Sequence, residues 1–184
     1  VGSEMCIRDS YKSSPNQVGA LTNWSSVSCG NSYTVSVKTD GTLWSWGYNA
    51  FGQLGLNNTT SYSSPKQVGA LTNWLSVASG GYHTVSIKTD GTLWAWGRNT
   101  EGQLGQGNTT NYSSPKQVGA LTNWLSVSCG SYHTVSIKTD GTLWSWGYNN
   151  VGQLGLGGTA NYRSPKQVGA LTSWACLLYT SDAA

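Results

Sequence analysis

Two short runs of alternating character recur along the chain, and both are rich in β-branched and aromatic residues. In the second copy they read HTVSIK (83–88) and TLWAWG (92–97), a composition and alternation typical of β-strands. The segment between them contains Asp90 and Gly91. Asp-Gly is a strong signal for a type I′ turn, because both central residues of that turn need positive φ. The pattern therefore predicts a β-hairpin.

A two-residue turn at this place fixes which residues lie opposite each other in the hairpin. The predicted pairs are Ile87 with Trp94 and Val85 with Trp96 on one face, and Ser86 with Ala95 and Thr84 with Gly97 on the other. The hairpin then has a large face and a small face, and it can stack on copies of itself. Since each tryptophan has roughly 150–250 Å² to bury, neighbouring copies must cover the rings.

The whole pattern repeats every 50 residues, marked by prolines at Pro15, Pro65, Pro115 and Pro165. Three full units cover 11–60, 61–110 and 111–160, and a partial unit covers 161–174. The tails 1–10 and 175–184 break the pattern and resemble translated adapter sequence at the ends of a metagenomic fragment. We therefore expect both tails to be non-native or disordered.

Two further strands are expected in each unit. In the second unit they lie near 66–69 and 74–79 and would complete a four-stranded sheet with the hairpin. The segment 99–110 (NTEGQLGQGNTT) is too rich in Gly and Asn for regular structure, so we expect a connecting loop. Four short strands in a unit of this length are typical of a propeller blade, with a solenoid as the lesser alternative. The predicted fold is all-β, a partial β-propeller of about three four-stranded blades.

Composition narrows the classes of function. Charged residues make up 9% of the 184 residues, against a typical share of about 25%, which excludes a coiled coil. The ten tryptophans exclude a disordered chain. No apolar run approaches the ~18 residues of a membrane-spanning helix, so no membrane contact is expected. The net charge is +3, but no run of Lys or Arg could follow a phosphate backbone, so we expect no nucleic-acid partner.

The histidines and aspartates that could suggest an enzyme have simpler interpretations. His83 and His133 lie on strands with Ser and Asp nearby, but Tyr33 stands at the same position of the first unit. A general base that one unit can lose is better interpreted as a packing and hydrogen-bonding residue. The aspartates of the Asp-Gly turns are interpreted as turn residues. We therefore predict no catalytic residue and no enzyme.

The cysteines and the GQLG segments suggest no bound metal or cofactor. Cys29 and Cys129 occupy a position where the second unit has Ser79, so we interpret them as small packing residues. The chain has no CxxC pair and no His at metal-ligand spacing. The GQLG segments lack the Lys-Ser/Thr of a phosphate-binding loop. The prediction is no metal and no cofactor.

A longer motif extends over each unit. The run GYHTVSIKTDGTLWAWGRNTEGQLGQG (81–107), with SPKQV (114–118) after it, resembles the regulator of chromosome condensation repeat. The third unit matches equally well, and the first departs once, with Tyr33 at the His position. WD repeats would need Trp-Asp where this chain has Trp-Gly, and kelch repeats need a doubled Gly in every unit. The resemblance implies a seven-bladed propeller, of which this chain would form an arc. The lesser alternative is a half that closes the ring by pairing with a second copy.

The units differ most in the residues that follow each Trp-Gly pair. These are the six residues predicted to bind a partner, Tyr48, Phe51, Arg98, Glu101, Tyr148 and Val151. Loops on a rigid scaffold commonly carry function, and Tyr and Arg are enriched at binding hot spots. Neutral drift of exposed loop residues is the alternative.

The prediction for function is a non-enzymatic propeller module for protein–protein interaction, binding through variable loops on one rim. The resemblance also implies an alternative, guanine-nucleotide exchange on a small GTPase, which is an activity known in the family. Low charge with abundant Trp and Tyr makes carbohydrate binding a further alternative. The two terminal blades each expose a face meant for a neighbour, so self-association through them is also expected.

Overall fold

The computed structural model describes residues 17, 18, 20 and 22–175, which form twelve β-strands and no helix. The first sheet contains β1 (Trp24–Gly30), β2 (Tyr33–Lys38), β3 (Leu43–Gly47) and β4 (Tyr62–Gln67). The second contains β5 (Trp74–Ser79), β6 (His83–Lys88), β7 (Leu93–Gly97) and β8 (Tyr112–Gln117). The third contains β9 (Trp124–Cys129), β10 (His133–Lys138), β11 (Leu143–Gly147) and β12 (Tyr162–Gln167). The predicted tails 1–10 and 175–184, except Ala175, lie outside the described residues.

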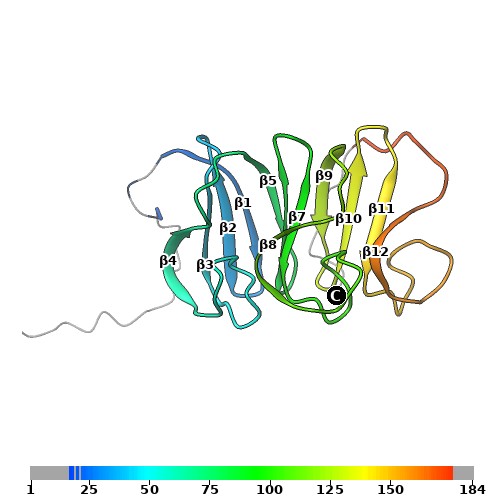
Figure 1. Cartoon of the computed structure of the whole chain (residues 1–184), viewed down its shortest axis with the longest axis horizontal. Coiled ribbons are helices and arrows are strands. Elements are labelled where there is room, and N and C mark those ends of the chain that lie inside the picture. The colour runs from blue at the N-terminus through cyan, green and yellow to red at the C-terminus, as the bar shows by residue number, and fades with distance from the viewer. Residues whose placement is uncertain (1–16, 19, 21, 176–184) are drawn as a thin grey trace, which may run out of the picture.

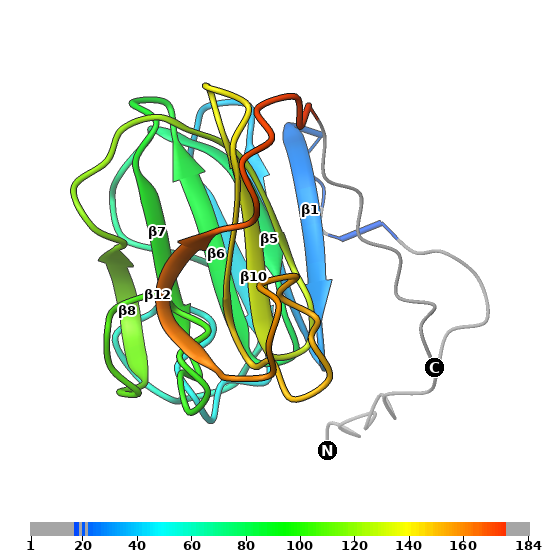
Figure 2. The ribbon, with the colours of Figure 1, turned by 90° about the vertical axis from the view of Figure 1, so that its right-hand side faces the viewer.

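Each sheet is an antiparallel meander with its strands in chain order. The three sheets stand side by side in an arc that does not close (Figure 1). In the view turned by 90° (Figure 2), β8 and β12 lie on one side and β1 on the other. Main-chain hydrogen bonds join neighbouring sheets, from Asn31 N to Gly81 O at 3.0 Å and from Gly81 N to Ser131 O at 3.1 Å. This architecture confirms a partial propeller, and we call its sheets the first, second and third blade.

The predicted hairpin register is wrong by one residue. The observed pairs in the second blade are Ile87 with Leu93, Ser86 with Trp94, Val85 with Ala95 and Thr84 with Trp96. Trp94 and Trp96 therefore share a face with Ser86 and Thr84. Val85, Ile87, Leu93 and Ala95 make the opposite, aliphatic face. The same register occurs in the other two blades.

The cause is the turn, which has three loop residues instead of two. Only Gly91 takes positive φ (75°), and Asp90 does not. The Gly91 amide donates to Lys88 O at 2.9 Å, and the Lys88 amide donates to Thr92 O at 3.0 Å. This is a type I turn followed by a left-handed glycine. Asp90 favours it, because its Oδ1 accepts a hydrogen bond from the Thr92 amide at 3.0 Å.

Tryptophans fill the junctions between successive blades, as predicted. Trp96 is fully buried against the aliphatic face of the first blade, with Val35, Val37 and Leu43 in the same core cluster. Trp146 is buried in the same way against Val85, Ile87 and Leu93 of the second blade. Each junction therefore joins a tryptophan face of one blade to an aliphatic face of the other. The predicted register instead places the tryptophans and the aliphatic residues together on one large face.

The sheets are offset from the sequence units. The strand expected near 66–69 is present as β4, but it pairs with β3 of the first blade and not with the hairpin 83–97. The strand expected at 74–79 is confirmed as β5. The long segment after β3 turns back and lets β4 pair antiparallel with β3, so each blade takes its outer strand from the next sequence unit.

The GQLG segments lie in the long loops, as predicted, and they bind the next blade. The main-chain oxygen of Gln53 accepts hydrogen bonds from Trp96 Nε1 at 2.9 Å and from Thr84 Oγ1 at 2.8 Å. Further along the same loop, Asn57 N donates to Ser113 O at 2.8 Å. A side chain at Gly55 would meet the Trp96 indole, with its Cβ 2.8 Å from Nε1. The long loop of one blade therefore binds the neighbouring blade through these hydrogen bonds and close contacts.

Candidate interaction surface

The six residues predicted to bind a partner lie in the loops that leave β3, β7 and β11. These strands occupy the same place in each blade, so the three loops emerge on the same rim of the arc, one from each blade. Tyr48 and Val151 are exposed, with 41% and 79% of their surface accessible. Phe51, Arg98, Glu101 and Tyr148 are half-buried.

Tyr82 and Tyr132, which are not among the six predicted residues, pack against residues of these loops. The Tyr82 ring lies 6.0 Å from that of Tyr48 and 5.3 Å from that of Phe51, centroid to centroid. The Tyr132 and Tyr148 rings are 6.1 Å apart. These separations are typical of favourable aromatic pairs.

Arg98 connects the two aromatic groups. Its guanidinium carbon lies 5.4 Å from the Phe51 ring centroid and 5.1 Å from the Tyr132 ring centroid, within the range of a cation–π interaction. Its Nε also donates to Thr100 Oγ1 at 3.0 Å. The result is a continuous surface across three blades that we call the aromatic belt, made of Tyr48, Phe51, Tyr82, Arg98, Tyr132 and Tyr148.

Strand pairing explains why Tyr82 and Arg98 meet. His83 pairs with Gly97 at the end of the hairpin, and the Arg98 amide donates to Tyr82 O at 2.9 Å. The two residues therefore extend the ladder by one position. A comparison of the units could have found this site, because Tyr82 and Tyr132 stand where the first unit has Ser32.

Buried asparagines fix the loops that carry the belt. Asn49 is fully buried, and its Oδ1 accepts from Leu54 N at 2.9 Å. Its Nδ2 donates to Asn58 O at 3.0 Å and to Thr60 O at 2.9 Å. Asn99 and Asn149 repeat this bridging role in the other loops. The belt residues therefore project from an ordered scaffold.

Glu101 and Val151 do not join the belt. Glu101 Oε2 accepts a hydrogen bond from Asn161 Nδ2 at 2.9 Å, which ties it to the next loop. Val151 takes the position of Phe51 in the third loop and is the most exposed of the six. The structure therefore brings together four of the six predicted residues.

Comparison with known sequence families identifies this architecture. The pattern of the regulator of chromosome condensation (RCC1) repeat matches residues 40–87, 90–137 and 140–175. A second RCC1 repeat pattern matches 24–53, 74–103 and 124–153. This chain belongs to the RCC1 repeat family. No curated protein sequence matches it as a whole.

Solved RCC1-type structures share the fold. Human WBSCR16 is 26% identical with a TM-score of 0.70, over 78% of this chain and 37% of that protein. Prp20p from Saccharomyces cerevisiae, which binds Gsp1p and histones, is 24% identical with a TM-score of 0.73, over 82% of this chain and 39% of that protein. A yeast RCC1 (Prp20) bound to Kap60 gives a TM-score of 0.72 at 24% identity. The chain thus spans under two fifths of each of these proteins.

The histidine position of the RCC1 repeat is a bridge between blades. His83 is fully buried, with Nε2 3.1 Å from Thr134 Oγ1 of the third blade. Burial lowers the pKa of His83 to about 3, with a smaller contribution from His133, so the imidazole is neutral at pH 7. At the same position of the first blade, the Tyr33 hydroxyl donates to His83 O and Thr84 Oγ1 donates to that hydroxyl. The packing and hydrogen-bonding interpretation is confirmed.

The aspartates act as turn residues, as predicted. Thr92 donates to Asp90 Oδ1 from its amide at 3.0 Å and from its hydroxyl at 2.6 Å. These hydrogen bonds lower the pKa of Asp90. Asp40 and Asp140 make the same bonds with Thr42 and Thr142.

The cysteine prediction holds for one of the two residues. Cys129 is buried, with Sγ 3.8 Å from Ala78 O, and burial raises its pKa to about 12. Cys29 is exposed, because no further sheet lies against this side of the first blade in the described part of the chain.

A search of the described residues for other sites gives two negative findings. They contain no group of three or more His, Cys, Asp or Glu placed to hold a metal ion. Within the same residues, no helix has the length and apolarity to cross a membrane.

Proposed function

We propose that this chain is a protein-binding RCC1-type module whose contact surface is the aromatic belt. The observation that carries the proposal is Arg98, held between Phe51 of the first loop and Tyr132 of the third blade. Tyr and Arg are the residue types enriched where binding energy concentrates. Fixed rings lose little conformational entropy on binding, which favours affinity.

The belt also suggests what kind of protein surface it takes. The five rings give an apolar contact area in which neighbouring rings are inclined by 53° to 75°, and Arg98 supplies one cation between them. Glu101 is directed to Asn161 and so leaves that cation without a carboxylate partner in the belt. A partner that presents an acidic side chain among apolar ones would satisfy both features.

The test is affinity capture with matched variants. The chain with Tyr48, Arg98 and Tyr148 all changed to Ala should lose proteins that the unchanged chain captures, and each must then be tested again as a purified partner. The control changes Lys66, Lys116 and Lys166 to Ala, because these exposed lysines lie on the outer strands. Equal binding of a purified partner by both variants and the unchanged chain would reject the belt.

The exchange-factor alternative remains a prediction with its own assay. Prp20p binds Gsp1p, but a likeness at 24% identity supports the fold alone. Nucleotide release from a small GTPase at the buffer rate would reject this alternative. The carbohydrate alternative loses its main support, because Trp96 and Trp146 are fully buried and cannot stack on a sugar.

A further inference from the structure

Two equivalent cavities lie at the blade junctions. The cavity between the second and third blades has a volume of about 370 Å³, and that between the first and second has about 380 Å³. Both volumes fall within the range of small-molecule sites. The walls repeat at the 50-residue spacing, with Val68 and Val118, Trp74 and Trp124, Trp94 and Trp144, and Pro115 and Pro165 as counterparts.

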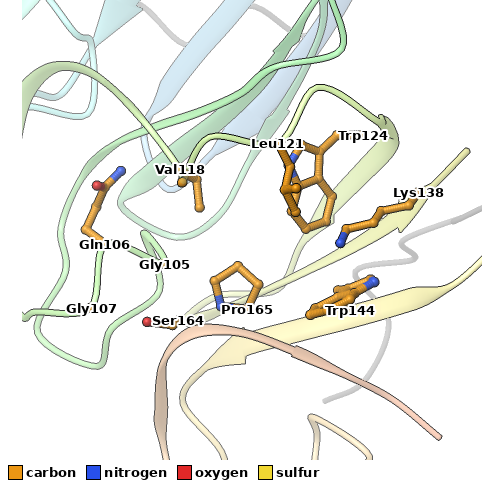
Figure 3. A pocket seen from close by; sticks show the side chains of 11 residues that line it. Gly105, Gln106, Gly107, Val118, Leu121, Trp124, Lys138, Trp144, Ser164 and Pro165 are labelled. Atoms are coloured by element: carbon orange, nitrogen blue, oxygen red, sulfur yellow. The ribbon is translucent and has the colours of Figure 1, made fainter. Parts of the chain in front are cut away.

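A lysine reaches into the cavity between the second and third blades. Figure 3 shows the Lys138 ammonium between Trp124 and Trp144, with Pro165 and Val118 farther along the cavity. Its Nζ lies 3.7 Å from the Trp144 ring centroid and 4.9 Å from that of Trp124. Only 6% of the Lys138 surface is exposed. The cavity therefore has apolar walls and one cation.

The surrounding hydrogen bonds hold the indole in place but leave the ammonium without an acceptor. Trp144 Nε1 donates to Thr142 Oγ1 at 2.8 Å, and Thr142 Oγ1 donates to Asp140 Oδ1 at 2.6 Å. Asp140 Oδ1 is thus engaged by Thr142. Among the described residues, no hydrogen-bond acceptor is paired with Lys138 Nζ. Burial lowers the pKa of Lys138, and the negative charge of Asp140 offsets part of that effect.

The first junction repeats this arrangement. Lys88 is 5% exposed, and its Nζ lies 3.8 Å from the Trp94 ring centroid and 4.7 Å from that of Trp74. Trp94 Nε1 donates to Thr92 Oγ1 at 2.8 Å. The linings of the two cavities differ. Leu56 and Asn57 in the first replace Gln106 and Gly107 in the second, and Lys138 lines its cavity whereas Lys88 lies behind the first cavity's lining, against Trp74 and Trp94.

We propose that the cavity between the second and third blades binds a small carboxylate with an apolar body. A carboxylate oxygen accepts a hydrogen bond from Lys138, which then has an anionic hydrogen-bond partner. The apolar body lies against Trp144, Val118 and Pro165 and displaces water from these walls. The site is separate from the aromatic belt and does not depend on the proposed protein binding.

The first experiment needs no variant. Isothermal titration calorimetry compares 2-naphthoate with 2-naphthamide, which has the same shape without the negative charge. Because a hydrogen bond to a charged group contributes more than a neutral one, we expect the amide to bind at least about tenfold more weakly. Equal affinity for the two compounds, or no binding of naphthoate, would overturn the proposal.

The location is tested by NMR on the same unchanged chain. Adding naphthoate should shift the indole N–H signal of Trp144, which lines the cavity with Lys138, more than that of Trp94 in the first junction. Shifts restricted to belt residues or to other tryptophans would contradict the assignment.

The lysines are tested by matched substitutions. Lys138→Met should weaken naphthoate binding at least about tenfold and leave naphthamide binding unchanged, because only the charge contact is lost. Lys138→Arg should retain naphthoate binding, since the cation is kept. The control, Lys66→Met with Lys116→Met, alters exposed lysines on outer strands and should change nothing. Unchanged naphthoate affinity in the first variant would contradict the site, and circular dichroism checks that each variant is folded.

Discussion

The blade junctions and the aromatic belt follow opposite rules. At the junctions, the residues that contact a neighbouring blade are the same in successive copies. For example, Trp96 and Trp146 donate hydrogen bonds to the main-chain oxygens of Gln53 and Gln103 in the preceding blade. At the belt, equivalent positions carry Tyr48, Arg98 and Tyr148. The junction side chains are buried and the belt side chains reach solvent. For these two sets of positions, identity between copies accompanies burial at a junction, and difference accompanies exposure at the loop tips.

The histidine position shows that this rule concerns contacts and not residue types. Tyr33 and His83 differ in chemistry, yet each bonds to the blade that follows it. A junction position can therefore vary as long as the replacement still reaches its neighbour.

The largest expected effect is at the junction core. Trp96→Ala should lower the free energy of unfolding by about 3–5 kcal/mol, because it removes a fully buried ring and leaves a cavity. Tyr48→Ala, on an exposed tip, loses mainly its ring pair with Tyr82 and should lower it by about 1 kcal/mol. Urea unfolding monitored by circular dichroism compares the two. If both variants lose a similar free energy of unfolding, the junction residues are no more important for stability than the belt residues.

A pair of glycines separates backbone strain from the junction contact. Gly55 has φ of 74°, and an added Cβ would lie 2.8 Å from Trp96 Nε1. Gly69 has φ of 61° with no atom within 4 Å of such a Cβ. Both Ala variants strain the backbone, but Gly55→Ala should be less stable than Gly69→Ala by about 1–3 kcal/mol. Thermal or urea unfolding measures the difference. Equal stability of the two variants would show that the close contact between Gly55 and Trp96 does not stabilise the junction.

The pH dependence of stability tests the buried histidine. Folding holds the pKa of His83 at about 3, against about 6.5 in an unfolded chain. The unfolded state therefore binds the extra proton, so stability is full above pH 6.5 and falls as pH drops toward 3. The limiting slope is roughly 1.4 kcal/mol per pH unit for one proton.

His83→Tyr, which copies the first blade, should flatten that slope between pH 6.5 and 4. His133 is the control, because burial lowers its pKa as well but its side chain is only half-buried. His133→Tyr should flatten the slope less. Urea midpoints measured across this pH range decide the question, and an unaltered slope in His83→Tyr would count against the neutral buried imidazole.

The smallest expected effect on stability is in the belt. Arg98→Ala loses cation–π contacts at a half-exposed site and should cost less than about 1 kcal/mol. Its effect on partner binding should be much larger than its effect on unfolding. A loss of stability comparable with that of Trp96→Ala would make Arg98 a structural residue.

The sequence predicts the strands well and their register poorly. Asp-Gly correctly marks the hairpin turn, but the Asp90 side chain bonds to Thr92 and selects a three-residue loop. That choice depends on a side-chain hydrogen bond, which a dipeptide signal does not include. The β4 strand is found in sequence but is assigned to the wrong sheet, because its partner is set by the path of the preceding loop.

The candidate surface is predicted in part for a related reason. Tyr48, Phe51, Arg98 and Tyr148 follow from the differences between units, but Tyr82 meets them only through pairing across the hairpin. The predicted hairpin register is one residue out and does not place Tyr82 beside Arg98, so the only sequence signal for Tyr82 is its difference from Ser32 in the first unit. Glu101 and Val151 satisfy the same sequence criterion and still lie outside the belt.

Gln53 has a consequence for how such repeats can diversify. Its Oε1 accepts from the Phe51 amide at 3.0 Å, while its main chain holds the next blade. With Asn49 it encloses a tip of three residues between two fixed anchors. Gly52, the third of these, has φ of 80°, and an added Cβ would lie 2.5 Å from Ser113 Cα. New recognition chemistry can therefore be introduced at positions 50 and 51 and their counterparts without altering the contacts that join the blades.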